Sequence, residues 1–139
     1  MVNGYYEGTR PFVTAIVMMP RLGRAARIAL LVDTGSDSTV IHPLDARRLR
    51  LNFRRDFPEA RRGSGFGVGG VAEEYIDGAE LRFRVESGAW HSVSLPIGIA
   101  IPTDANSRLP SLLGQDVIGQ FRLICDATAG VVRLADPEP

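Results

Sequence analysis

The chain contains no lysine, because all sixteen of its basic residues are arginine. Schiff-base catalysis and phosphate binding by a P-loop both need a lysine, so these two chemistries are excluded. Cys125 is the only cysteine, which excludes an internal disulfide and a zinc site built from several cysteines. A single cysteine fits a reducing compartment. We expect no metal and no cofactor.

Long hydrophobic runs are also absent. The longest apolar runs are far shorter than the ~20 residues that a membrane helix needs. The first residues lack a basic region followed by an apolar one, so no signal peptide is expected. Sixteen acidic residues balance the arginines and give a formal net charge of +0. We therefore expect a cytoplasmic protein that binds neither membrane nor nucleic acid.

Short extended segments fill most of the sequence. A length of 139 residues favours one domain, residues 1–139, with residues 136–139 as a frayed tail. In residues 79–86, apolar and charged residues alternate, which predicts a strand with one buried face. Residues 28–32 are continuously apolar, which predicts a strand buried on both faces. The other predicted strands are residues 11–19, 40–41, 90–101, 121–125 and 131–134.

Helical signals are few. Pro43 suits the first turn of a short helix that reaches about Leu51. Residues 52–62 are polar and rich in arginine, and they are predicted to form a loop, as are residues 102–110. Many short strands with one or two short helices indicate an all-β protein, a small closed barrel-like domain.

The tripeptide Asp33-Thr34-Gly35 follows the apolar segment directly. A carboxylate in this place is unusual because burying a charge is costly. Gly35 allows a tight turn and the close approach of another chain. Taken alone, the tripeptide more often marks the end of a strand with a solvated aspartate, so its context decides the interpretation.

Four segments supply that context: residues 10–14 (Arg-Pro-Phe-Val-Thr), 30–40 (Leu-Leu-Val-Asp-Thr-Gly-Ser-Asp-Ser-Thr-Val), 66–70 (Phe-Gly-Val-Gly-Gly) and 112–116 (Leu-Leu-Gly-Gln-Asp). In sequence and in order, these segments resemble motifs of the retroviral aspartic proteases. Residues 109–117 are most similar to the small stand-alone bacterial version. The resemblance implies the retropepsin fold and an aspartic endopeptidase that cleaves extended peptide or protein segments.

Such enzymes use two carboxylates that share one proton. The chain contains only one Asp-Thr-Gly and no Asp-Ser-Gly, so the second carboxylate must come from a second copy. A homodimer supplies it on a two-fold axis, where the two Asp33 side chains meet.

The resemblance also implies roles for neighbouring residues. Thr34 would link the two active-site loops across the axis, and Gly35 would offer its carbonyl to the substrate. Asp37 would hold the substrate main chain and pair with arginine. Arg10 matches one of the two arginines that this family uses, but Gln115 stands where the second is expected.

Three further expectations follow from the same comparison. The hydroxyl of Ser36 should donate to a catalytic carboxylate and favour its charged form. Gly67, Val68, Gly69 and Gly70 should form the tip of a hairpin that covers the substrate. Leu113, Gly114 and Asp116 should complete, with Gln115, the motif that opens a C-terminal helix near the dimer interface.

Other interpretations remain open. Residues 65–70 match the pattern G-x-G-x-x-G, but no apolar strand precedes them and no helical pattern follows, so dinucleotide binding is disfavoured. Seven arginines lie between Arg47 and Arg62, but interspersed acidic residues favour a solvated surface over a nucleic-acid patch. The histidines, Trp90 and Cys125 are predicted to be structural or core residues. The alternative function is a catalytically weak or inactive protease-like module that binds a peptide or a partner protein.

Overall fold

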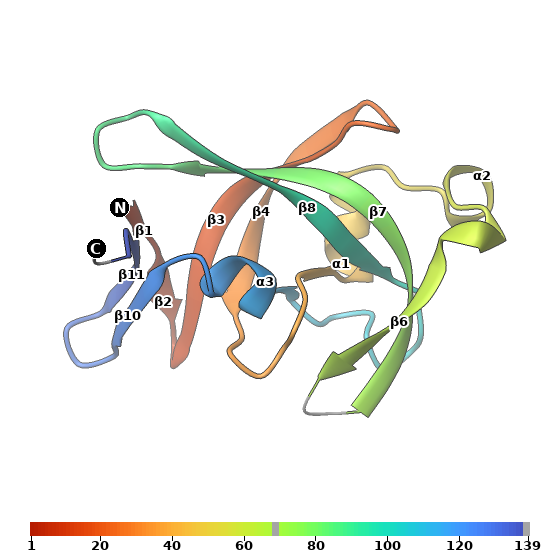
Figure 1. The fold of residues 1–139 in the computed structure, drawn as a ribbon. Helices are drawn as coiled ribbons and strands as arrows, with labels where there is room; N and C mark the ends of the chain where they lie inside the picture. The colour runs from red at the N-terminus through yellow and green to blue at the C-terminus, as the bar shows by residue number, and fades with distance from the viewer. Residues whose placement is uncertain (68–69, 138–139) are drawn as a thin grey trace.

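The computed structural model describes residues 1–67 and 70–137, and most of them lie in strands (Figure 1). In chain order, the strands are β1 (Val2–Asn3), β2 (Tyr5–Glu7), β3 (Arg10–Met19), β4 (Arg24–Val32), β5 (Val40–Ile41), β6 (Arg62–Gly67), β7 (Gly70–Arg84), β8 (Trp90–Ala100), β9 (Ser111–Leu113), β10 (Arg122–Asp126) and β11 (Val131–Ala135). The helices of the described residues are α1 (Pro43–Arg48), α2 (Phe53–Asp56), the 3-10 helix η1 (Glu59–Arg61) and α3 (Gln115–Ile118). The predicted all-β class is confirmed. The predicted number of short helices, one or two, was too low.

The strands form two sheets. The larger sheet has the order β2-β3-β4-β9-β5-β8-β7-β6, and β3 also pairs with β7. This additional pairing joins β3, β4, β9, β5, β8 and β7 into a closed ring. The smaller sheet has the order β1-β11-β10, and its β10 and β11, which pair antiparallel, correspond to the strands predicted at residues 121–125 and 131–134.

Apolar side chains from every strand of the ring fill the core. Those with no exposed surface include Val13, Val17, Leu30, Ile41, Leu81, Phe83, Ile99 and Leu113. They alternate along each strand with residues that point away from the core, as the pleat of a strand requires.

Strand β4 is buried on one face only, so the prediction of two buried faces was wrong. Ile28, Leu30 and Val32 are buried, whereas Ala29 and Leu31 keep part of their surface exposed. No second layer of the described structure covers this other face completely.

Residues 52–62 are not the predicted loop, because α2, η1 and the start of β6 lie there. The side chain of Asn52 accepts hydrogen bonds from the backbone N–H groups of Arg54 and Arg55 at 3.1 and 3.0 Å, which caps α2. The buried carboxylate of Asp56 accepts from the Asn52 N–H and from Arg24 at 2.7 and 2.6 Å. A helix cap and ion pairs with distant strands, including Asp56 with Arg24 and Arg61 with Asp77, therefore order a segment that looks like a surface loop in the sequence.

Two predicted core residues lie on the surface. Trp90 is 44% exposed, and the Arg84 guanidinium lies 5.2 Å from the centre of its ring. This stacking covers an aromatic face without burying it in the core. Cys125 is also exposed, on β10 at the edge of the smaller sheet. None of the helices in residues 1–67 and 70–137 is long and apolar enough to cross a membrane.

Candidate active site

Asp33 is the first residue after β4, and hydrogen bonds fix both its backbone and its side chain. Its N–H donates to the carbonyl of Leu113 at 3.0 Å. One oxygen of its carboxylate accepts from the N–H of Gly35 at 2.9 Å, so the turn itself orients the side chain. The carboxylate remains partly exposed at the end of a buried strand.

The segment that follows β9 encloses this turn. The N–H groups of Gln115 and Asp116 donate to the carbonyls of Ser36 and Asp37 at 2.8 and 3.1 Å. The two loops touch so closely that a Cβ atom on Gly114 would collide with the backbone of Ser38. The structure thus brings together the predicted motifs at residues 33–37 and 113–116, and it gives Gly114 a steric reason to be glycine.

Thr39 and Asp116 form the buried link between these loops. The Thr39 hydroxyl donates to one carboxylate oxygen of Asp116 at 2.8 Å, and the Thr39 N–H donates to the other at 2.9 Å. The same hydroxyl accepts from the N–H of Gly114 at 3.1 Å. Asp116 therefore positions the loop that contains Asp33, together with Thr39, which was not among the predicted site residues.

Gln115 has a specific contact of its own. Its side-chain amide donates to the carbonyl of Thr34 at 3.0 Å. A neutral amide thus ties α3 to the Asp33 turn at the place where an arginine was expected. The Thr34 side chain is exposed, and a contact between copies through it stays a prediction.

The prediction for the Ser36 hydroxyl was wrong. Ser36 is buried, and its Oγ donates to the carbonyl of Ser38 at 2.8 Å. The hydroxyl has a single proton, so it cannot also donate to Asp33 in this arrangement. Ser36 stabilises the loop rather than the charge of the carboxylate.

Arg10 and Asp37 are not brought together within one chain. The Arg10 guanidinium lies over the ring of Phe12, 5.4 Å from its centre. Asp37 is exposed, and within residues 1–67 and 70–137 no cation lies within ion-pair distance of its carboxylate. An ion pair between Arg10 and Asp37 of different copies stays a prediction.

One face of the barrel next to Asp33 is apolar and half-exposed. Residues that pair across a ladder share a face, and so do residues two apart along a strand. From Leu31, two residues before Asp33, the pairs lead to Leu112, then to Val40, Gly98 and Ile76. The four side chains of this row, which we call the cleft face, are each partly exposed. An apolar surface beside a carboxylate suits an extended peptide.

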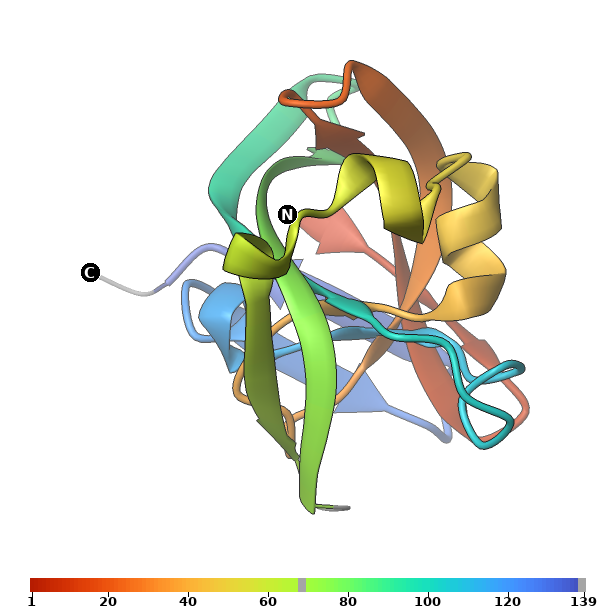
Figure 2. The same cartoon turned by 90° about the vertical axis from the view of Figure 1, so that its right-hand side faces the viewer.

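The hairpin of β6 and β7 projects beside this face. In both views it extends toward the end of the barrel where the loop after β4 lies (Figure 1, Figure 2). The two strands pair as far as Gly67 and Gly70. The predicted tip residues Val68 and Gly69 lie outside the described residues. The hairpin itself is present as expected, and its role as a cover stays a prediction.

A polar cluster of His42, Asp45 and Ser111 does not belong to this site. Ser111 Oγ donates to Asp45 at 2.6 Å and accepts from the backbone N–H of His42 at 3.0 Å, while the His42 ring contacts the carbonyl of Pro110. The histidine ring does not contact the serine, so this is a structural cluster and not a hydrolase relay. No group of three or more potential metal ligands occurs among the described residues.

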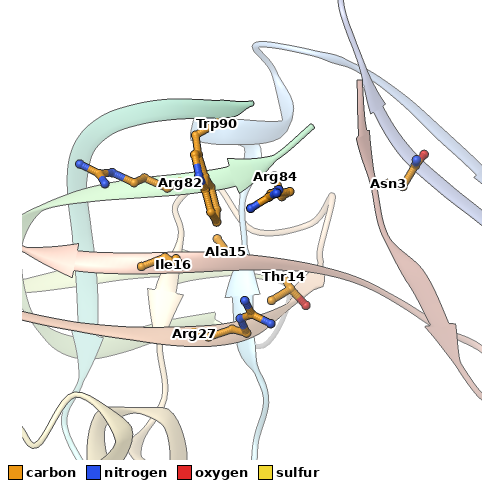
Figure 3. Close-up of a pocket in the computed structure, with 8 residues that line it drawn as sticks. All are labelled: Asn3, Thr14, Ala15, Ile16, Arg27, Arg82, Arg84 and Trp90. Carbon is orange, nitrogen blue, oxygen red and sulfur yellow. The ribbon is translucent and has the colours of Figure 1, made fainter. Parts of the chain in front are cut away.

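A pocket of about 360 Å³ lies on the outer surface of β3, β4 and β7, and it shares no lining residue with the site around Asp33 (Figure 3). It is lined by Asn3, Thr14, Ala15, Ile16, Arg27, Arg82, Arg84 and Trp90. Arg82 is already paired with Glu80 at 2.7 Å.

Of the seven arginines between Arg47 and Arg62, four also pair with carboxylates: Arg48, Arg55, Arg61 and Arg62.

No protein-family model matches the chain, and no curated protein matches it.

Proposed function

We propose that the chain is an aspartic endopeptidase of the retropepsin type that acts as a homodimer. Each copy contributes one Asp33, and the substrate is an extended peptide or protein segment. The peptide lies on the cleft face of each copy, beneath the two β6–β7 hairpins. No cofactor is required.

The mechanism needs two carboxylates that share one proton. The ionised Asp33 takes a proton from a water molecule, whose oxygen attacks the carbonyl carbon of the scissile bond. The protonated Asp33 of the partner subunit donates its proton to the carbonyl oxygen. As the C–N bond of the resulting diol breaks, the first Asp33 gives the proton it took from water to the leaving nitrogen, and one hydroxyl of the diol returns a proton to the partner's Asp33. Two close carboxylates suit this chemistry because they cannot both ionise easily.

A single observation carries the proposal: Asp33 is a fixed yet partly exposed carboxylate at the edge of an apolar face. The Leu113 carbonyl and the Gly35 N–H hold it, and residues 113–116 bind the rest of its loop. A merely solvated aspartate at the end of a strand needs no such support.

The test is cleavage of a mixed peptide library, followed by mass spectrometry. Asp33→Asn should abolish cleavage, because it removes the chargeable pair with little change in volume. Asp104→Asn makes the same chemical change in an exposed loop far along the chain and should leave cleavage intact. Cleavage that persists at an equal rate in Asp33→Asn would exclude this mechanism.

The second candidate is a binding module with the same fold and little or no catalysis. The contact from Gln115 to Thr34 favours it, because a neutral amide occupies the place of a charge expected in an active enzyme. The same library separates the two functions, since a binding module would retain peptides without cleaving them.

A further inference from the structure

Glu74 is a buried carboxylate without a partner. It lies on β7 and is only 4% exposed. Among the described residues, no side chain or backbone group donates a hydrogen bond to it, and no arginine lies within ion-pair distance. Its neighbour Glu73, by contrast, is exposed and pairs with Arg62 at 2.5 Å.

The carboxylate of Glu74 faces the cleft. Glu74 is two residues before Ile76 on the same strand, so both side chains lie on the cleft face. The carboxylate rests against the Cα of Gly98, and a Cβ atom at that position would collide with it. Gly98 is paired with Val40, seven residues after Asp33 in the sequence. Glu74 therefore lies on the wall that leads to the candidate active site.

This arrangement is costly for the isolated chain. Burial disfavours the charged form and raises the pKa of Glu74. Among the described residues no side-chain oxygen is both fully enclosed and without a hydrogen-bond partner, so the unpartnered carboxylate of Glu74 keeps some accessible surface through which a ligand can reach it. A cation that arrives with a ligand would supply the missing partner, and its attraction would be strong because little water remains to screen it.

We propose that Glu74 forms the end of a substrate subsite that takes a basic side chain, arginine or lysine, of the bound peptide. This proposal rests on the proposed function, since it names a residue that selects the substrate. The aliphatic stem of such a side chain would pack against Val40, Leu112 and Ile76, while its charged end would reach the carboxylate. The absence of a side chain at Gly98 leaves the room that Glu74 occupies.

The experiment compares matched peptides that carry either arginine or citrulline at each position near the scissile bond. Citrulline keeps the shape of arginine but lacks its charge. The unaltered protein should cleave the arginine peptide at one position about 10-fold or more faster in kcat/KM, as a hydrogen-bonded charge pair implies. Glu74→Gln should remove this preference while retaining cleavage of the citrulline peptide. Glu73→Gln removes the adjacent exposed carboxylate and should keep the preference.

A binding arm separates this proposal from the proposed catalysis. The same peptides are titrated against Asp33→Asn protein and against the double variant Asp33→Asn, Glu74→Gln. Tighter binding of the arginine peptide that disappears in the double variant supports the subsite, even if the unaltered protein cleaves nothing. The subsite proposal would be overturned if Glu74→Gln kept the same preference for the arginine peptide in cleavage or binding. It would also be overturned if the unaltered protein preferred arginine over citrulline at no position.

Discussion

Thr39 has no exposed surface, and its hydroxyl serves two partners at once. Thr39→Val keeps the shape of the side chain but leaves the Gly114 N–H and one oxygen of Asp116 without their partner. We expect the free energy of unfolding to fall by about 2–3 kcal/mol. Urea denaturation followed by circular dichroism measures this loss. Thr39→Ser retains the hydroxyl and should lose about 1 kcal/mol, so an equal loss in both variants would contradict the role of the hydroxyl.

Glu74 should also affect stability through pH. Because its pKa is raised in the folded protein, the folded state holds the proton more tightly than the unfolded chain does. Glu74 therefore destabilises the folded state most at pH values above its raised pKa. The free energy of unfolding rises as pH falls from that pKa toward the usual value of 4.5. We expect Glu74→Gln to be more stable than the unaltered protein at pH 7, with the difference shrinking on acidification. Denaturation curves at several pH values measure it, and a difference that grows toward acid pH would refute the sign.

Among the elements, α2 depends on a single buried carboxylate. Burial acts to raise the pKa of Asp56, but hydrogen bonds from the Asn52 N–H, Arg24 and Arg55 outweigh it and hold the pKa below its usual range. Because its pKa is lowered in the folded protein, ionised Asp56 stabilises the fold at pH values above 3.8. This stabilisation is lost as pH falls through the pKa of Asp56 in the folded protein. Asp56→Asn should cost about 3 kcal/mol at pH 7, because it breaks a buried ion pair.

The loss of unfolding free energy caused by Asp56→Asn should be smaller at pH 3 than at pH 7. Below pH 3.8 the unaltered protein progressively loses the same interaction. Urea denaturation at the two pH values tests this. The exposed Asp104→Asn is the matched control and should change little at either pH. A cost independent of pH would mean that the charge of Asp56 does not stabilise α2.

Strands could be predicted from the sequence where one face meets the core. The alternation in residues 79–86 and the apolar residues of β3, β8 and β11 carry that signal. Helix α2 could not be predicted from the sequence, because its Asp56 is held by Arg24 on β4, a strand distant in sequence. Trp90 was wrongly placed in the core for a similar reason, since its partner Arg84 becomes a neighbour only when β7 and β8 pair.

The candidate site could be predicted only as far as its motifs extend. Residues 33–37 and 113–116 do come together in the structure. The donation from Ser36 to Ser38 was not foreseeable, because a hydroxyl's partner depends on the path of the loop. Glu74 gave no signal either, since nothing in the alternation along its strand distinguishes a buried carboxylate from an exposed one.

At the scale of the whole molecule, the decisive expectation concerns assembly. Each chain holds one Asp33, so a single copy has half of the proposed site. We expect specific activity to fall on dilution, with the concentration at half-maximal activity matching the dimer dissociation measured by sedimentation. Constant specific activity in a range where only monomer sediments would contradict a shared site.

The hydrogen bonds between the two loops also have a consequence for how the chain is made. The contacts that hold the Asp33 turn span 75 to 81 residues of sequence. Contacts between such distant segments form late and slow folding, because a long loop must close first. During synthesis, Asp33 leaves the ribosome long before Gly114 and Gln115 do. The turn therefore lacks these contacts in the nascent chain until residues 113–116 have also been released.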